Sequence, residues 1–329
     1  MGKPEAPPAY TSGPPEGTSR PYTDTDYDQP PPLVGDEPVY FESADPRGWS
    51  VTINNRFWTD GFRIFVSKDS AEKFEAFKNN PNTHIIDLQQ KGIGVPLFKA
   101  INPLNPVTTK FLTFRRYVPN QNGRFDIDKD FYIYCQVKKK FHMGYNTYVF
   151  DFTPDPQSSK ANFQVVMFAH STLPICDYKY KGEVHRWIDE SYRRKFKTYF
   201  QVKFGFKHSV LRPGQPSLVD NWDGHSDKLD KGKPNPYLKS LFKMKLNPSA
   251  RLAKPEYYGE RCTAILGEAE SYFKLGYGEV RIDDLYNPDP DVDYESIFSM
   301  HDDALVLVCV ATVLKRQKDI EEDARRRSQ

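Results

Sequence analysis

Lysines recur at alternating positions in three predicted strands, in which every second side chain points to the same face. In the stretch 199–207, Lys203 and Lys207 lie opposite a row of Phe and Val side chains, and in 131–138 Lys138 lies opposite Phe, Ile, Cys and Val. The same rule places three further lysines on the outer face of 237–246, namely Lys239, Lys243 and Lys245. If these strands are neighbours, their ammonium groups form a positive wall suited to an anionic surface such as phospholipid headgroups. The competing interpretation is a solvated surface that serves solubility alone.

Charge is segregated along the chain, although the formal net charge is only +2. The segment 1–46 and the segment from 246 onward are acidic, whereas 138–245 carries twice as many Lys and Arg as Asp and Glu. A globally basic nucleic-acid binder is therefore not indicated, but a basic middle region facing an anionic partner is.

Three aspartates, Asp289, Asp291 and Asp293, resemble the start of a calcium-binding loop. The pattern fails at two places, because Tyr294 stands where such a loop needs glycine and Met300 where it needs glutamate. We therefore expect no metal or other cofactor, and these aspartates stay weak candidates beside the better interpretation, an acidic linker.

No common catalytic motif is present. The nearest is Gly224-His225-Ser226-Asp227, which lacks the second glycine of a nucleophile elbow. The histidines show no ligand spacing, and the four widely spaced cysteines favour free thiols over disulfides or a zinc site. The sequence therefore predicts that the protein is not an enzyme.

A proline-rich segment, 1–46, contains 11 of the 27 prolines and almost no aliphatic residues, which predicts disorder. It contains Pro7-Pro8-Ala9-Tyr10, a P-P-x-Y element of the kind that WW domains bind. Pro7, Pro8 and Tyr10 are thus candidate contacts for a WW-domain protein such as a ubiquitin ligase, while chance occurrence in a Pro- and Tyr-rich segment is the alternative.

Short strands separated by turn residues dominate the chain from about residue 47. The stretch 49–66 predicts two strands, and further strands are expected around 83–89, 96–101, 111–118 and 131–141. Later strands are expected in 146–153, 162–171 and 260–286. Short helices are expected after Ser70 as a cap and within 184–196. The long connection 208–236 is rich in Gly, Pro, Asp and Asn, and we expect it to be disordered or weakly packed.

The most apolar stretch is Ala304 to Leu314, which carries no charge. Two acids precede it and cations follow it, the order that a helix dipole favours. Eleven residues of helix rise about 16 Å, roughly half of a bilayer's hydrocarbon core, so the stretch predicts a buried core helix of about 302–318 and no transmembrane span. A buried strand is the alternative, because four valines are β-branched.

Many short strands followed by an apolar helix resemble the tubby C-terminal superfamily, which includes the phospholipid scramblases and the LURP-one-related proteins. The residues that carry the resemblance are the Asp302-Asp303 lead-in, the apolar Ala304 to Leu314, and the acidic segment 282–294 before them. The resemblance covers roughly 47–318 in outline and implies a mainly β fold. It further implies a closed antiparallel barrel of about twelve strands around a central C-terminal helix, with anionic phospholipid, such as phosphoinositide, bound by basic residues on the barrel.

The expected organisation is thus a disordered tail (1–46), a barrel domain (47–318) and a charged C-terminal tail (319–329). The expected function is a non-enzymatic, cytoplasmic module that binds anionic phospholipid peripherally and recruits a WW-domain partner. A cytosolic scaffold without lipid binding and a scramblase-like protein are the alternatives.

Overall fold

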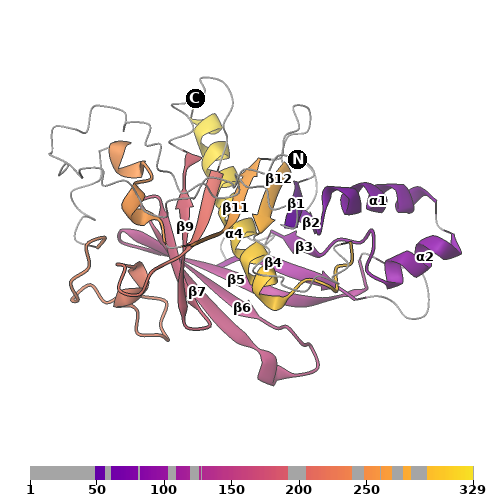
Figure 1. The fold of residues 1–329 in the computed structure, drawn as a ribbon, viewed down its shortest axis with the longest axis horizontal. Coiled ribbons are helices and arrows are strands. Elements are labelled where there is room, and N and C mark those ends of the chain that lie inside the picture. The colour runs from indigo at the N-terminus through magenta and orange to yellow at the C-terminus, as the bar shows by residue number, and fades with distance from the viewer. Residues whose placement is uncertain are drawn as a thin grey trace, which may run out of the picture. The chain divides into compact units, whose positions relative to one another are not determined.

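A closed antiparallel β-barrel surrounds a C-terminal helix (Figure 1). The computed structural model describes residues 49–55, 61–80, 82–102, 109–118, 126, 128–191, 205–238, 248–259, 261–268, 277–282 and 295–328. Within them, twelve strands follow one another round the barrel in chain order, and β1 pairs with β12 to close it. The fold class expected from the sequence is therefore confirmed. The predicted tail 1–46 lies outside the described residues.

Every strand pairs with its neighbours in sequence, so the barrel is an up-and-down meander. The strands are β1 (Trp49–Asn55), β2 (Gly61–Phe65), β3 (Phe98–Ile101), β4 (Lys110–Tyr117), β5 (Phe131–His142), β6 (Tyr145–Phe152), β7 (Phe163–His170), β8 (Ile175–Tyr180), β9 (Glu183–Asp189), β10 (Gly205–Val210), β11 (Arg261–Glu268) and β12 (Tyr277–Ile282). The helices are α1 (Lys68–Asn79), α2 (Thr83–Gln90) and α4 (Asp302–Arg327), with 3-10 turns η2 (Ser159–Ala161), η3 (Leu218–Asn221), η4 (Pro248–Arg251) and η5 (Pro255–Tyr257).

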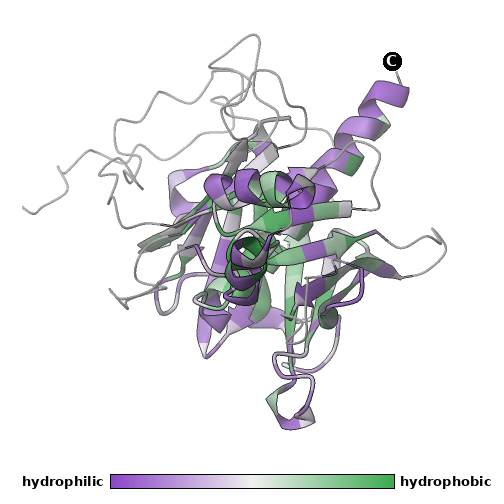
Figure 2. Cartoon of the chain, turned by 90° about the vertical axis from the view of Figure 1, so that its right-hand side faces the viewer, coloured by the Kyte–Doolittle hydropathy of each residue, from purple (hydrophilic) through white to green (hydrophobic). Residues whose placement is uncertain are grey.

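Helix α4 fills the barrel with its first half and leaves it with its second. Every side chain from Ala304 to Lys315 is buried, which explains why this half needs no polar face. The helix continues to Arg327, so the predicted end at 318 is wrong. Figure 2 shows hydrophilic final turns leading to the C-terminus. No helix among the described residues is both long and apolar enough to span a membrane.

Two of the four cysteines are packed in the barrel core as free thiols. All four are free, as their spacing predicted, and Cys135 of β5 is buried like Cys309 of α4. Burial raises the pKa of the Cys135 thiol well above its usual value, and contact with Cys309 adds to the effect. These two thiols therefore act as small apolar side chains of the core.

Helices α1 and α2 lie together beside the barrel (Figure 1). Helix α1 begins after Ser67, whose hydroxyl accepts a hydrogen bond from Ser70 N at 2.9 Å, so Ser67 and not Ser70 is the cap. The stretch around 83–89, expected as a strand, is helix α2. Its two adjacent isoleucines are compatible with a strand or a helix. The Asn82 side chain favours the helix because it caps the first turn, accepting a hydrogen bond from Ile85 N at 2.9 Å.

Strand β9 occupies part of 184–196, where a helix was expected. Its inner side chains, His185 and Trp187, face the barrel core, while Arg186 and Ile188 point outward and are buried as well. Burial on both faces removes the alternation of polar and apolar residues that would have marked it as a strand.

A second apolar core lies outside the barrel, where the segment 211–238 and η5 cover strands β6 to β9. Leu218, Val219 and Leu229 from this segment are buried against Phe168 and Ile188 of the strands. The expectation that 208–236 is weakly packed is therefore wrong.

Candidate functional site

The structure describes only two of the six lysines that were expected to form one basic face. Lys138 belongs to β5 and Lys207 to β10. The other four lie outside the described residues, and so do the WW-binding candidates and the weak metal candidates: Lys203, Lys239, Lys243, Lys245, Pro7, Pro8, Tyr10, Asp289, Asp291 and Asp293. The strands that carry Lys138 and Lys207 are not neighbours, because β5 pairs with β4 and β6 whereas β10 pairs with β9 and β11. These two lysines therefore do not form one basic face.

Lys207 lies on the outer face of β10, as the alternation predicts, but only 8% of its surface is exposed. Its ammonium pairs with Glu190 at 3.5 Å and lies 5.9 Å from the centre of the Tyr258 ring. Tyr258 follows η5, which belongs to the second layer over the barrel. The expectation of an open Lys207 is therefore wrong, because another segment covers this part of the strand.

Lys138 is half-exposed near the end of β5, where it pairs with Asp151 of β6 at 2.9 Å. It begins the run Lys138-Lys139-Lys140, and residues 131–150 contain no Asp or Glu. The positive charge of this run is balanced only by carboxylates from other parts of the chain. The β5–β6 hairpin therefore carries a run of three lysines within its own length and a single carboxylate, Asp151.

The hairpin turns at Met143-Gly144, where His142 pairs with Tyr145. Gly144 has φ 91°, a left-handed conformation that suits glycine. Phe141 is 77% exposed and Met143 65%, which makes them the two most exposed large apolar side chains of the described residues. Turns normally carry polar residues, so this apolar tip requires an explanation.

The segment 223–231 packs along the hairpin and adds cations beside the tip. Asp227 forms an ion pair with Lys140, and its carbonyl accepts a hydrogen bond from Thr147 Oγ1 at 2.8 Å. Leu229 N donates to the Tyr145 hydroxyl at 2.9 Å, and Lys231 Nζ donates to the Met143 carbonyl at 3.1 Å. We call Lys138, Lys140, Phe141, Met143, Lys228 and Lys231 the tip surface.

Lys139 points to the inner side of the hairpin and connects the tip with α4. Its ammonium donates to Gln317 Oε1 at 2.7 Å and lies 4.5 Å from the centre of the Phe141 ring. Burial lowers the pKa of Lys139, and the nearby Glu321 carboxylate opposes this effect. The tip and the charged last turns of α4 therefore leave the barrel at the same end.

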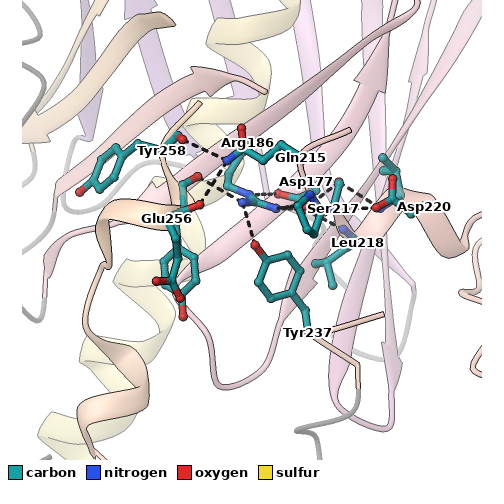
Figure 3. A network of polar contacts seen from close by, with 12 residues as sticks. Asp177, Arg186, Gln215, Ser217, Leu218, Asp220, Tyr237, Glu256 and Tyr258 are labelled. Carbon is teal, nitrogen blue, oxygen red and sulfur yellow. Dashed lines mark hydrogen bonds and ion pairs between the residues drawn. The ribbon is translucent and has the colours of Figure 1, made fainter. Parts of the chain in front are cut away.

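A buried ion pair holds the covering segment in place (Figure 3). Arg186 Nε and Nη2 donate to the two carboxylate oxygens of Asp177 at 2.7 and 2.8 Å, and both side chains are fully buried. The same carboxylate accepts from Ser217 Oγ at 2.9 Å and from Leu218 N at 2.8 Å. Burial opposes the charge of Arg186, but the attraction of Asp177 is stronger, so the pKa of Arg186 is raised.

The guanidinium has further acceptors on both covering segments. Arg186 Nη2 donates to the Pro216 carbonyl at 2.9 Å, and Nη1 donates to the Tyr257 carbonyl at 3.2 Å. The pair thus joins β8 and β9 to the segment that carries Lys228 and Lys231. This bidentate pair therefore anchors the segment at Pro216 to Leu218.

His170 provides a second anchor. Its Nδ1 accepts from Thr172 N at 3.0 Å and from Leu173 N at 2.8 Å, and its Nε2 donates to the Tyr237 carbonyl at 3.1 Å. This arrangement requires a neutral imidazole, and burial lowers the pKa of His170, although the Tyr237 carbonyl acts in the opposite direction.

The Gly224 to Asp227 stretch, which came nearest to a nucleophile elbow in the sequence, forms a turn. The Ser226 hydroxyl donates to the Lys228 carbonyl at 3.1 Å, and Asp223 accepts from the backbone of 225 and 226, so 223–228 is a hydrogen-bonded turn. Among the described residues, no group of three or more His, Cys, Asp or Glu side chains could hold a metal ion.

Sequence reasoning missed that the fold brings His185 and His208 together. Their rings stack inside the barrel at 5.2 Å, and His208 Nδ1 lies 2.5 Å from Thr263 Oγ1. They come from different strands, so no spacing in the sequence could show the pair.

A family model described as DIA1 matches residues 45–326. The chain belongs to the DIA1 family. No curated protein and no solved structure matches it. The DIA1 match begins close to the boundary predicted at residue 47 and includes the barrel, α4 and the whole tip surface. The resemblance to the tubby superfamily stays a prediction.

Sequence reasoning also missed the tip surface as a unit in this DIA1-family chain. The available signal was the stretch KKKFHMG, 138–144, in which a lysine run leads into large apolar residues at a glycine turn. Lys228 and Lys231 gave no such signal, because only the packing of 223–231 on the hairpin brings them to the tip.

Proposed function

We propose that this DIA1-family chain is a non-enzymatic binding module that docks peripherally on the cytoplasmic face of a membrane containing anionic phospholipid. The observation that supports the proposal is the tip surface, where two segments distant in sequence place exposed lysines around one hairpin turn. Each Lys near an anionic membrane contributes about 1 kcal/mol to binding. Four lysines therefore give a useful affinity even when Lys138 and Lys140 are partly neutralised by Asp151 and Asp227.

The PPAY element completes the proposed function. In this proposal, Pro7, Pro8 and Tyr10 recruit a WW-domain protein while the barrel binds the membrane. A phosphoinositide is one anionic lipid that the tip surface would accept, since clustered ammonium groups act on phosphate as point charges. A scaffold without lipid binding is the competing function, and in that case the tip lysines serve solubility only.

Removal of two tip lysines should weaken binding to anionic vesicles. Lys228 and Lys231 are both exposed, so the double change Lys228→Ala, Lys231→Ala should cost about 2 kcal/mol of binding, roughly thirtyfold in affinity. Co-sedimentation of the full chain with phosphatidylcholine vesicles, with and without phosphatidylserine, measures the loss.

The matched control is the double change Lys68→Ala, Lys78→Ala on α1, which removes the same charge from another exposed surface. We expect the control to bind like the unmodified chain. An equal loss of vesicle binding in both double variants would mean that only the net charge of the chain matters. That result would contradict a defined docking surface. The triple change Lys239→Ala, Lys243→Ala, Lys245→Ala tests the sequence-predicted face in the same assay.

A further inference from the structure

We propose that Phe141 and Met143 form an apolar wedge that inserts into the boundary between headgroups and acyl chains. This proposal rests on the proposed function and adds to it the part of the chain that enters the lipid. The two side chains flank the hairpin turn and are 77% and 65% exposed. Water contact of two large apolar groups is unfavourable, and a membrane removes that contact.

The wedge is held rigidly, which lowers the entropy cost of insertion. Gly144 O accepts from Ser171 N at 3.0 Å, so the neighbouring turn supports the hairpin. Met143 O accepts from Lys231 Nζ at 3.1 Å. The Lys139 ammonium lies 4.5 Å from the centre of the Phe141 ring, and it donates a hydrogen bond to Gln317 Oε1. The tip is therefore already arranged before it meets a membrane.

Charge around the wedge identifies the occupant as an anionic bilayer. Lys140 precedes Phe141 in the chain, Lys231 donates to the Met143 carbonyl, and Lys228 belongs to the segment 223–231 that packs on the hairpin, while residues 131–150 contain no Asp or Glu. An apolar tip with lysines beside it suits a surface that has an apolar layer beneath phosphate groups. Two residues reach only a shallow depth, about 5–10 Å into the boundary between headgroups and acyl chains. A second copy of this chain would meet the same lysines and be repelled by them.

Tryptophan scanning tests the insertion directly. The full chain carrying Phe141→Trp or Met143→Trp is bound to phosphatidylserine-containing vesicles whose acyl chains are brominated near the headgroup. We expect more quenching than in the unmodified chain, whose own four tryptophans supply the baseline. The matched control is Ile133→Trp, since Ile133 is 43% exposed on the same strand and lies roughly 26 Å from position 141 along it. Its quenching should equal the baseline.

Serine substitution measures the contribution of the wedge. Phe141→Ser and Met143→Ser should each weaken vesicle binding about tenfold, and the loss should persist at high salt, where attraction between charges is screened. The thermal midpoint should not change, because both side chains are mostly exposed.

The outcomes separate the two proposals. Vesicle binding without quenching of F141W or M143W overturns the wedge and leaves peripheral docking intact, whereas no binding to anionic vesicles overturns both. Loss of self-association in the serine variants, without quenching in the tryptophan variants, would overturn the wedge in favour of a contact between copies of the chain.

Discussion

Asp177→Ala should lower the free energy of unfolding by about 3–5 kcal/mol. The substitution leaves the Arg186 guanidinium fully buried without its carboxylate, and it removes the acceptor of Ser217 Oγ and Leu218 N. An uncompensated buried charge is among the few causes of such large losses. Urea unfolding followed by circular dichroism measures the change.

The surface pair on the hairpin supplies the control. Asp151 pairs with Lys138 at 2.9 Å as Asp177 pairs with Arg186, but both partners are partly exposed. Asp151→Ala should therefore cost about 1 kcal/mol or less. Equal losses in the two variants would contradict the assigned role of the buried pair.

The same substitution should release the covering segment. Because Asp177 and Arg186 hold Ser217, Leu218 and Pro216, their loss should raise the rate of proteolysis within 211–238 before the barrel unfolds. Docking on vesicles should fall as well, since this segment presents Lys228 and Lys231. Uniform proteolysis over the whole chain would show that the pair stabilises the barrel generally.

Val308→Asp should abolish cooperative folding of the barrel. Val308 is fully buried in the middle of α4, and an unpaired carboxylate at such a position costs several kcal/mol, close to the whole stability of a typical domain. Loss of the thermal transition and of ordered near-ultraviolet circular dichroism is the expected result.

Ile320→Asp on the same helix is the matched control. Ile320 is exposed beyond the barrel, so the added charge remains in water and the thermal midpoint should change little. A Val308→Asp variant as stable as this control would mean that α4 does not fill the barrel.

The first half of α4 could be predicted because its surroundings are the same on every side. A helix enclosed all round must be apolar all round, and 304–314 has that composition. A strand with one covered face, such as β5, could likewise be found from alternation. In these elements, apolar residues face the barrel core and polar residues face water, so the order of apolar and polar residues in the sequence predicts them.

Strand β9 and the covering segment could not be predicted for the opposite reason. Arg186 and Asp177 occupy outward positions, where charge normally indicates solvent, but they are buried because 211–238 lies over them. The same rule put Lys207 on the correct outer face but predicted it to be exposed, whereas Glu190 and Tyr258 enclose it. A second layer over a barrel depends on contacts between residues that are distant in sequence. The periodicity of apolar residues within one segment does not reveal such contacts.

The tip surface contains some residues that could be predicted from the sequence and others that could not. Lys138 follows from alternation, and the run of three lysines is visible in the sequence. The exposure of Phe141 and Met143 required the structure, because the same residues could have entered the core. Their position at the turn, with Lys231 beside them, changes the predicted basic wall into a compact hairpin tip.

Binding of the unmodified full chain to vesicles of defined charge tests the central claim most directly. Partition is measured by co-sedimentation with phosphatidylcholine vesicles and with phosphatidylcholine–phosphatidylserine vesicles, each at low and high salt. Binding to the anionic vesicles should exceed binding to the neutral ones. It should also decrease several-fold as the Debye length falls from about 10 Å at 0.1 M to about 3 Å at 1 M salt. Equal partition into both kinds of vesicle, or no partition into either, would contradict an anionic membrane as the partner of the tip surface.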